Sequence, residues 1–240
     1  MIRFVLIFLI TLNCFAQNNS QFIIKEFVND RSVHYLNKNN FPFKNDVIFE
    51  DSTYKLTASC KGEWGGTLFF ANKVSNKVYY VSSTCPVAIN KLNNKYYVSN
   101  TLMHGSGHSN VLEINNPDSL MIHLNENGKK KTKLMGEIGI KSNKGSTTLL
   151  ESKYGEFIIT SFTFQNKLYH IVSDYKTTFL TEVKNNKFER LATISQKSIR
   201  NYEPKLYKTK DNHTIVFFEN DETEGYLDIF ENKINVMRIK

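Results

Sequence analysis

Short apolar stretches alternate with breaks rich in asparagine, glycine and lysine along almost the whole chain. Few windows place apolar residues three and four positions apart, and β-branched and aromatic residues dominate the apolar stretches. This pattern predicts strands rather than helices, so we expect an all-β protein. The predicted strands span residues 53–59, 67–71, 77–82, 87–91, 96–100, 111–114, 120–124, 157–164, 167–172, 179–183, 188–194, 214–219, 226–230 and 234–239.

A turn pattern recurs between these strands. The sequence Asn-Lys-Val-Tyr at 76–79 returns as Asn-Lys-Leu-Tyr at 166–169, and Asn-Asn-Lys-Tyr at 93–96 returns as Asn-Asn-Lys-Phe at 185–188. A shorter echo, Asn-Lys-Ile, stands at 232–234. The first two patterns recur after about 90 residues and the third follows after about half that distance, which indicates a period of about 45 residues. Such a period, holding four short strands, resembles the blades of β-propellers.

Two further turns, near 37–38 and 127–128, extend this resemblance over nearly the whole mature chain. It implies a single domain over 17–240 with five four-stranded blades. A β-sandwich or a pair of stacked meanders is the alternative all-β fold.

Residues 1–16 have the three parts of a secretory signal peptide. Arg3 supplies the positive charge, 4–12 form an apolar run, and a short polar segment ends at Ala16. The run of about nine residues is shorter than the roughly 20 that span a bilayer as a helix. Cys14 suggests a lipid-modified cysteine as an alternative, but 11–13 lack the small residues of such a processing site.

We therefore expect cleavage after Ala16 and export, to the periplasm or beyond the cell, with no transmembrane segment in the mature chain. The ending Phe-Ala-Gln at 15–17 resembles the signal peptides of exported Bacteroidetes proteins. Cleavage would leave Cys60 and Cys85 in a compartment that permits disulfides. We expect a bond between them that closes a loop of about 25 residues, with two buried free thiols as the alternative.

The net charge of the whole chain is +8, with 31 basic against 23 acidic residues. Such a balance attracts acidic glycans, anionic envelopes or nucleic acid. The charges are spread thinly, however, and the one dense cluster, at 129–133, follows an Asn-Gly turn. Export argues against nucleic acid, so we expect no nucleic-acid partner and assign the charge mainly to composition.

Binding residues of a propeller lie on the loops that join the outermost strand of one blade to the innermost strand of the next. The repeat pattern assigns the loops 60–66, 103–109, 152–156 and 210–213 to this face. The binding candidates on them are Glu63, Trp64, His104, His108, Tyr154, Glu156, Asp211 and His213.

Two of these candidates have alternative interpretations. Trp64, between glycines and beside Glu63, suits stacking on a sugar ring, whereas the alternative is a Trp that plugs a blade junction. His104 and His108 lie four positions apart, as in a zinc pair on a helix, but the Gly-Ser-Gly between them disfavours a helix, and a third ligand would be needed. We expect no metal site and no cofactor.

No catalytic motif is present: the chain has no Gly-x-Ser-x-Gly elbow, no Cys-x-x-Cys and no phosphate-binding loop. Propeller glycoside hydrolases carry paired carboxylates on innermost strands. The strands assigned that position, 67–71, 111–114 and 157–164, offer only Glu113 and the flanking Glu156.

The sequence therefore predicts an exported, non-catalytic protein that binds a glycan or an envelope protein through one propeller face. A small carboxylate-dependent glycoside hydrolase is the alternative, and a structural or scaffolding envelope protein is a second one. Its oligomeric state is left open.

Overall fold

The computed structural model describes residues 21–29, 36, 41, 47–60, 62–103, 107–123, 141–200, 205–219 and 224–239. Within these ranges the chain forms eighteen strands and two 3-10 turns, and no α-helix. The strands are β1 (Ile23–Asn29), β2 (Val47–Glu50), β3 (Tyr54–Ala58), β4 (Thr67–Asn72), β5 (Val78–Ser82), β6 (Pro86–Leu92), β7 (Lys95–Leu102), β8 (His108–Ile114), β9 (Met121–Ile122), β10 (Thr147–Glu151), β11 (Phe157–Phe164), β12 (Lys167–Ser173), β13 (Thr178–Lys184), β14 (Lys187–Ser195), β15 (Lys205–Lys208), β16 (Thr214–Glu219), β17 (Glu224–Phe230) and β18 (Lys233–Ile239).

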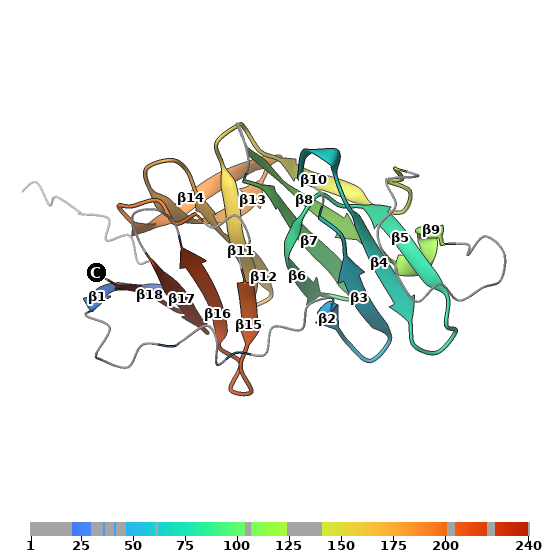
Figure 1. Ribbon diagram of the computed structural model, residues 1–240, viewed down its shortest axis with the longest axis horizontal. Helices are drawn as coiled ribbons and strands as arrows, with labels where there is room; N and C mark the ends of the chain where they lie inside the picture. Colours follow the sequence, from blue (N-terminus) through green and yellow to red (C-terminus); the bar gives the residue numbers. More distant parts are fainter. Residues whose placement is uncertain are drawn as a thin grey trace, which may run out of the picture.

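These strands form four sheets, which we number in chain order. Sheet I contains β2, β3, β4, β5 and β9, and sheet II contains β6, β7, β8 and β10. Sheet III contains β11 to β14, and sheet IV contains β15 to β18 with β1 added at its edge. Neighbouring strands are antiparallel throughout, except that β1 pairs in parallel with β18. Figure 1 shows the four sheets along the long axis of the molecule.

Tight hairpins set this meander. Asn93 and Asn94 join β6 to β7 with φ values of 50° and 62°, and Asn185 and Asn186 join β13 to β14 with 50° and 58°. Two residues at positive φ are what a type I′ turn needs, and asparagine tolerates that conformation better than most residues. The Asn-Asn repeat therefore reflects hairpin chemistry. It joins the first two strands of sheet II but the last two of sheet III, so it does not mark equivalent places in two blades.

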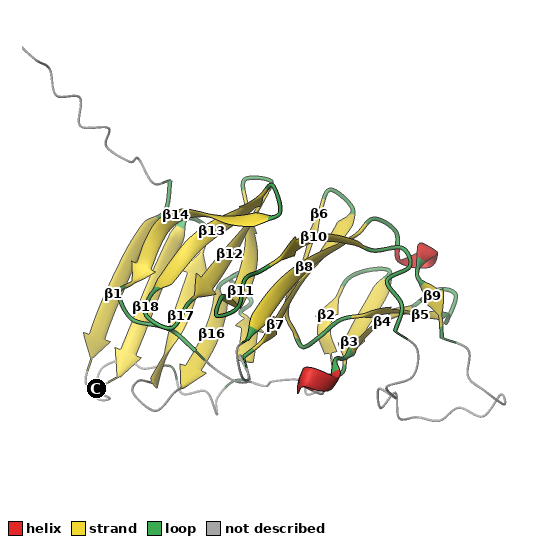
Figure 2. Cartoon of the chain, turned by 90° about the horizontal axis from the view of Figure 1, so that it is seen from above, coloured by secondary structure: helices red, strands yellow, loops and turns green. Residues whose placement is uncertain are grey.

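Apolar clusters join each sheet to the next one along the chain. Sheets I and II share a core that includes Leu56 and Val98, and sheets III and IV share one that includes Tyr169 and Val216. A smaller cluster joins sheets II and III: Val111, Leu150, Ile158 and Val172. Figure 2 shows the resulting order, with sheet IV at one end of the row and sheet I at the other.

The first strands of the sheets gather near the middle of the molecule. Strands β2, β11 and β15 all lie against β6, whereas the later strands of each sheet extend away from it. The sheets therefore fan out from β6, and none closes into a barrel.

The all-β prediction is confirmed, and all fourteen predicted strands coincide with observed ones, although only Met121–Ile122 of the stretch 120–124 is a described strand. Strands β1, β2, β10 and β15 were not predicted. Five blades are not confirmed, because the described residues form four sheets. The predicted signal peptide and the turns near 37–38 and 127–128 lie outside the described residues. No helix in the described part of the chain has the length and apolar character to cross a membrane.

Candidate functional site

Several loops lie at the same end of sheets I, II and III. We call this the loop end, and it comprises residues 62–66, 107–109, 152–156, 174–177 and 196–200. Two hydrogen bonds join the second of these segments to the third: the backbone N–H of Gly155 donates to the carbonyl of Gly107 at 3.0 Å, and that of Ser109 donates to Ser152 Oγ at 2.8 Å. The β7–β8 connection is thus fixed to the β10–β11 loop, which leads from sheet II into sheet III.

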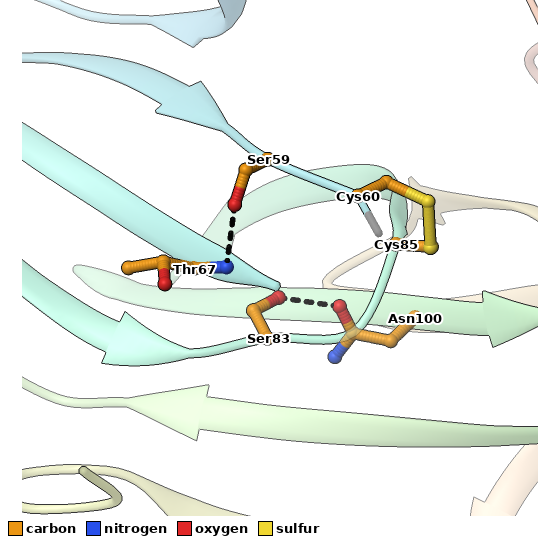
Figure 3. Close-up of a disulfide and its surroundings, with 6 residues drawn as sticks. All are labelled: Ser59, Cys60, Thr67, Ser83, Cys85 and Asn100. Atoms are coloured by element: carbon orange, nitrogen blue, oxygen red, sulfur yellow. Dashed lines mark hydrogen bonds between the residues drawn. A yellow bond between two sulfur atoms is a disulfide. The ribbon is translucent and has the colours of Figure 1, made fainter. Parts of the chain in front are cut away.

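The predicted disulfide between Cys60 and Cys85 is confirmed, with 4.4 Å between the two Cα atoms. It ties the β3–β4 loop to the segment that leads from sheet I into sheet II. Figure 3 shows two hydrogen bonds beside it: Thr67 N–H donates to Ser59 Oγ at 3.0 Å, and Ser83 Oγ donates to Asn100 Oδ1 at 2.5 Å. Because Asn100 belongs to β7, the segment to which the disulfide ties the β3–β4 loop is itself bonded to sheet II.

Trp64 ends a 3-10 turn over Gly62–Trp64 that this disulfide and these bonds hold at its base. Gly65 then turns back with a φ of +89°, a conformation that glycine adopts without strain, and its N–H donates to the carbonyl of Gly62 at 3.0 Å. The indole is 75% exposed. The interpretation of Trp64 as a plug between blades is therefore wrong, because a plug would be buried.

Two further exposed aromatic side chains, both tyrosines, lie on loops next to sheet III. Tyr154, a predicted candidate, is 79% exposed. Tyr175 is 51% exposed, packs edge-on against Phe157 with 5.5 Å between ring centroids, and has the guanidinium of Arg200 5.3 Å from its own centroid. Sequence reasoning missed Tyr175 and Arg200, because only the pairing of the strands shows that the β12–β13 turn shares an end with Tyr154.

The carboxylate of Asp174 shapes the turn that carries Tyr175. Its Oδ1 accepts the backbone N–H groups of Lys176 and Thr177, both at 2.7 Å. Burial alone would raise the pKa of Asp174, but these hydrogen bonds and the nearby Arg190 lower it. Asp174 is therefore an ionised structural group rather than a proton donor.

Asp211 and His213 do not join this site. The ring of His213 stacks on Phe230 at 4.4 Å, and its Nδ1 lies 2.7 Å from Asp228 Oδ1. Phe230 is the last residue of β17 and pairs with Lys233 at one end of sheet IV. Arg238 lies near the other end, where it donates a hydrogen bond to Ser195 beside the turns of sheet III. His213 therefore lies at the end of sheet IV that is away from those turns. Figure 1 likewise shows the β15–β16 turn at the opposite end of the molecule from the β3–β4 loop.

This difference has a topological cause. The repeat pattern predicts that all four loops connect one blade to the next, but only 152–156 joins one sheet to the next. In an antiparallel meander, successive connections alternate between the two ends of the sheets. Loops 60–66 and 103–109 join the second strand of a sheet to the third, two connections away from the predicted one, so they still lie at the same end as 152–156. Loop 210–213 joins a first strand to a second, one connection away from the predicted one, so it lies at the opposite end.

The remaining predicted binding residues are partly buried, lie beside Trp64 or fall outside the described residues. His108 begins β8 and is half-buried, and Glu156 is half-buried in the 152–156 loop, where its backbone carbonyl accepts a hydrogen bond from Ser109 Oγ at 2.9 Å. Glu63 lies next to Trp64 in the 3-10 turn. His104 lies outside the described residues. No three His, Cys, Asp or Glu side chains gather as metal ligands in the part of the chain that the structure describes.

The central strands also differ from the prediction. Strands β4 and β8, which cover the stretches 67–71 and 111–114, are the third strands of their sheets rather than innermost ones. The strands that do gather around the middle, β6, β11 and β15, contain no carboxylate residue. Glu50 of β2 forms an ion pair with Lys73 at 3.1 Å. The described centre therefore offers no pair of carboxylates for glycoside hydrolysis.

One buried Ser–His contact resembles a nucleophile and its base. Ser99 Oγ lies 3.4 Å from His170 Nδ1, between sheets II and III. Both side chains are fully buried, however, and burial lowers the pKa of His170 to about 3. A substrate cannot reach this pair, so it is part of the packing.

The chain matches no protein-family model, no curated protein and no solved structure. The function is therefore inferred from the geometry of the site.

Proposed function

We propose that the protein is an exported, non-catalytic binding protein that recognises a glycan through the loop end. The observation that carries this proposal is the exposure of Trp64, 75% of which is open to solvent on a covalently anchored loop. A flat indole offers a large apolar face, and the axial C–H groups of a pyranose ring form a matching apolar face. Stacking the two removes both from water while the hydroxyl groups of the sugar remain hydrated.

The anchoring of Trp64 also favours binding. The disulfide, the Thr67–Ser59 hydrogen bond and the 3-10 turn hold the loop before any ligand arrives. A ligand that docks on a preorganised loop loses less conformational entropy on binding.

The fold is proposed to be a propeller-like arrangement of blades. Four-stranded meanders succeed one another along the chain, and their first strands gather against β6, as innermost strands of blades do. A five-bladed form would need one more sheet than the four described. A packing of sheets as in a β-sandwich remains the alternative, since three of the apolar clusters lie between two neighbouring sheets.

A glycan-array screen tests this function. We expect wild type to bind at least one glycan, and Trp64→Ala to weaken that binding at least tenfold. Val74→Ala is the matched control, because Val74 is 84% exposed on the β4–β5 turn, away from the loop end; we expect its binding to equal wild type. No binding by wild type, or equal binding by Trp64→Ala, would reject the glycan proposal and favour an envelope protein as partner.

Export is tested separately by expression of the full chain in a bacterium. We expect the protein from the cell envelope or the medium to begin at Gln17, which intact-mass measurement detects. An unprocessed Met1 terminus in the cytosol would contradict this part of the proposal. A small glycoside hydrolase is less well supported, since the described central strands supply no carboxylate pair.

A further inference from the structure

We infer that the loop end selects acidic polysaccharides, chains that carry carboxylate or sulfate groups, through a cluster of aromatic and basic side chains on sheet III. This inference rests on the proposed function and names the class of glycan. The cluster comprises Lys153, Tyr154, Tyr175, Lys176, Lys197 and Arg200, all of which are exposed.

Three separate chain segments bring this cluster together. They are the β10–β11 loop, the β12–β13 turn and the segment after β14. Gly155 lies directly beneath the ring of Tyr175, where a Cβ atom would approach Tyr175 Cε2 to 2.8 Å. The Oγ of Ser198 donates a hydrogen bond to the carbonyl of Asp174, and Arg200 lies beside the Tyr175 ring. The three segments that carry these six exposed side chains are therefore packed together.

The charges of this surface are available to a ligand. Among the described residues, none of its four cations forms an ion pair, whereas strand cations such as Lys95 and Lys184 pair with neighbouring carboxylates. Two carboxylates lie in the same segments. Asp174 accepts its own turn's N–H groups and faces Arg190 at 3.6 Å, and Glu156 shares the loop of Lys153. Four cations against two carboxylates leave the surface positive.

The form of the surface favours a polysaccharide over a single small anion. Cations on three segments match charges that repeat along a chain, and the exposed rings of Tyr154 and Tyr175 supply faces for sugar rings between those charges. The planar guanidinium of Arg200 binds a carboxylate or a sulfate through two parallel hydrogen bonds. Nucleic acid has the same two requirements, rings and anions, so the test includes it.

The experiment compares four probes by calorimetry at low and high salt: heparin as a sulfated chain, polygalacturonate as a carboxylated chain, dextran as a neutral chain and a single-stranded oligonucleotide. We expect wild type to bind heparin or polygalacturonate at least tenfold more tightly than dextran or the oligonucleotide, with an affinity that falls as salt rises. Tighter binding of the oligonucleotide, or no preference over dextran, would overturn the inference.

A pair of double variants separates the cluster from net charge alone. K176Q/R200Q removes two charges from the cluster, and K55Q/K233Q removes two exposed charges from β3 and β18. We expect K176Q/R200Q to weaken acidic-chain binding at least tenfold with an unchanged melting temperature, and K55Q/K233Q to stay within twofold of wild type. An equal loss in both double variants would overturn the inference.

The outcomes also distinguish this inference from the proposed function. If Trp64→Ala abolishes binding of a neutral glycan while K176Q/R200Q binds every probe like wild type, the inference fails and the proposed function stands. If K176Q/R200Q loses acidic chains while Trp64→Ala keeps them, the inference stands and the role proposed for Trp64 fails. Absence of binding to any polysaccharide rejects both.

Discussion

The Nδ1 atom of His170 lies 3.4 Å from the Oγ atom of Ser99, so a histidine of sheet III faces a serine of sheet II across their interface. Ser99 Oγ donates to Ser161 Oγ at 2.9 Å, and Asn90 Nδ2 donates to the same oxygen at 2.8 Å. The interface thus contains a buried polar seam beside its small apolar cluster. Burial lowers the pKa of His170 to about 3.

This seam predicts acid sensitivity. The unfolded chain holds His170 at its ordinary pKa of 6.5, so between pH 6.5 and about 3 the unfolded state binds a proton that the folded state excludes. The contribution of His170 to stability is full above pH 6.5 and is lost as the pH decreases toward about 3. Urea unfolding at several pH values measures this slope.

His170→Gln removes the titrating group, so we expect it to flatten the slope between pH 6.5 and 4. His108→Gln, at a half-buried position on the loop end, is the control and retains the slope of wild type. A His170→Gln protein with the wild-type slope would show that other groups cause the acid sensitivity.

The disulfide predicts a redox-dependent stability. The bond closes a loop with a sequence separation of 25, which on the chain-entropy model adds about 3 kcal/mol to the free energy of unfolding. We expect reductant to lower the stability of wild type by that amount and to leave the double variant C60A/C85A unchanged. If reductant lowered the stability of both proteins equally, the loss would come from elsewhere.

The backbone around Gly66, beside the Trp64 loop, leaves no room for a side chain at this position. A Cβ atom there would lie 2.2 Å from the carbonyl oxygen of Ser59 and 2.6 Å from that of Ser83. Because both obstacles are backbone atoms, Gly66→Ala must displace the loop, and we expect a loss of about 2 kcal/mol or more.

Gly62→Ala is the matched control for this substitution. Its Cβ would meet nothing within 4 Å, so only its φ of +59° opposes the change, at a cost of about 1 kcal/mol. Thermal unfolding ranks the two variants. A Gly66→Ala protein as stable as Gly62→Ala would mean that the loop moves freely.

Local pattern was sufficient to predict most of the strands. Stretches such as 157–164 and 214–219 alternate or run apolar over six residues or more, and their predicted bounds equal the observed ones. Strands β2 and β15 have only four residues each, too few to show a period. Strand β1 depends on pairing with β18, a contact that no local pattern reveals.

The missed strands also explain how much of the site could be predicted. Trp64 and Tyr154 were found because glycine-rich, aromatic breaks indicate exposed loops regardless of strand number. The end of the molecule on which each loop lies depends on the number of strands before it. Without β15, His213 was placed with Trp64, and without the sheet pairing Tyr175 was overlooked.

The ion pair between Glu26 and Arg238 predicts how β1 is held. The Arg238 side chain is 3% exposed and donates to both Glu26 and Ser195. Glu26→Gln removes a charged partner of this buried guanidinium, and we expect a loss of about 2 kcal/mol in urea unfolding. Lys25→Gln, at the exposed neighbouring position, should change stability by less than about 0.5 kcal/mol. Equal effects of the two substitutions would contradict a specific role for the ion pair.

The parallel pairing of β1 with β18 has a consequence for the order of assembly. Ile23 pairs with Lys233 and Val28 with Arg238, so the earliest described strand finds its partner only after the latest one has been made. A contact of such long sequence separation is slow to form, and β1 presents an open edge meanwhile. The charged pair Lys25 and Glu26 in its middle discourages pairing with other chains during that interval. We therefore expect the pairing of β1 with β18 to complete sheet IV late in folding.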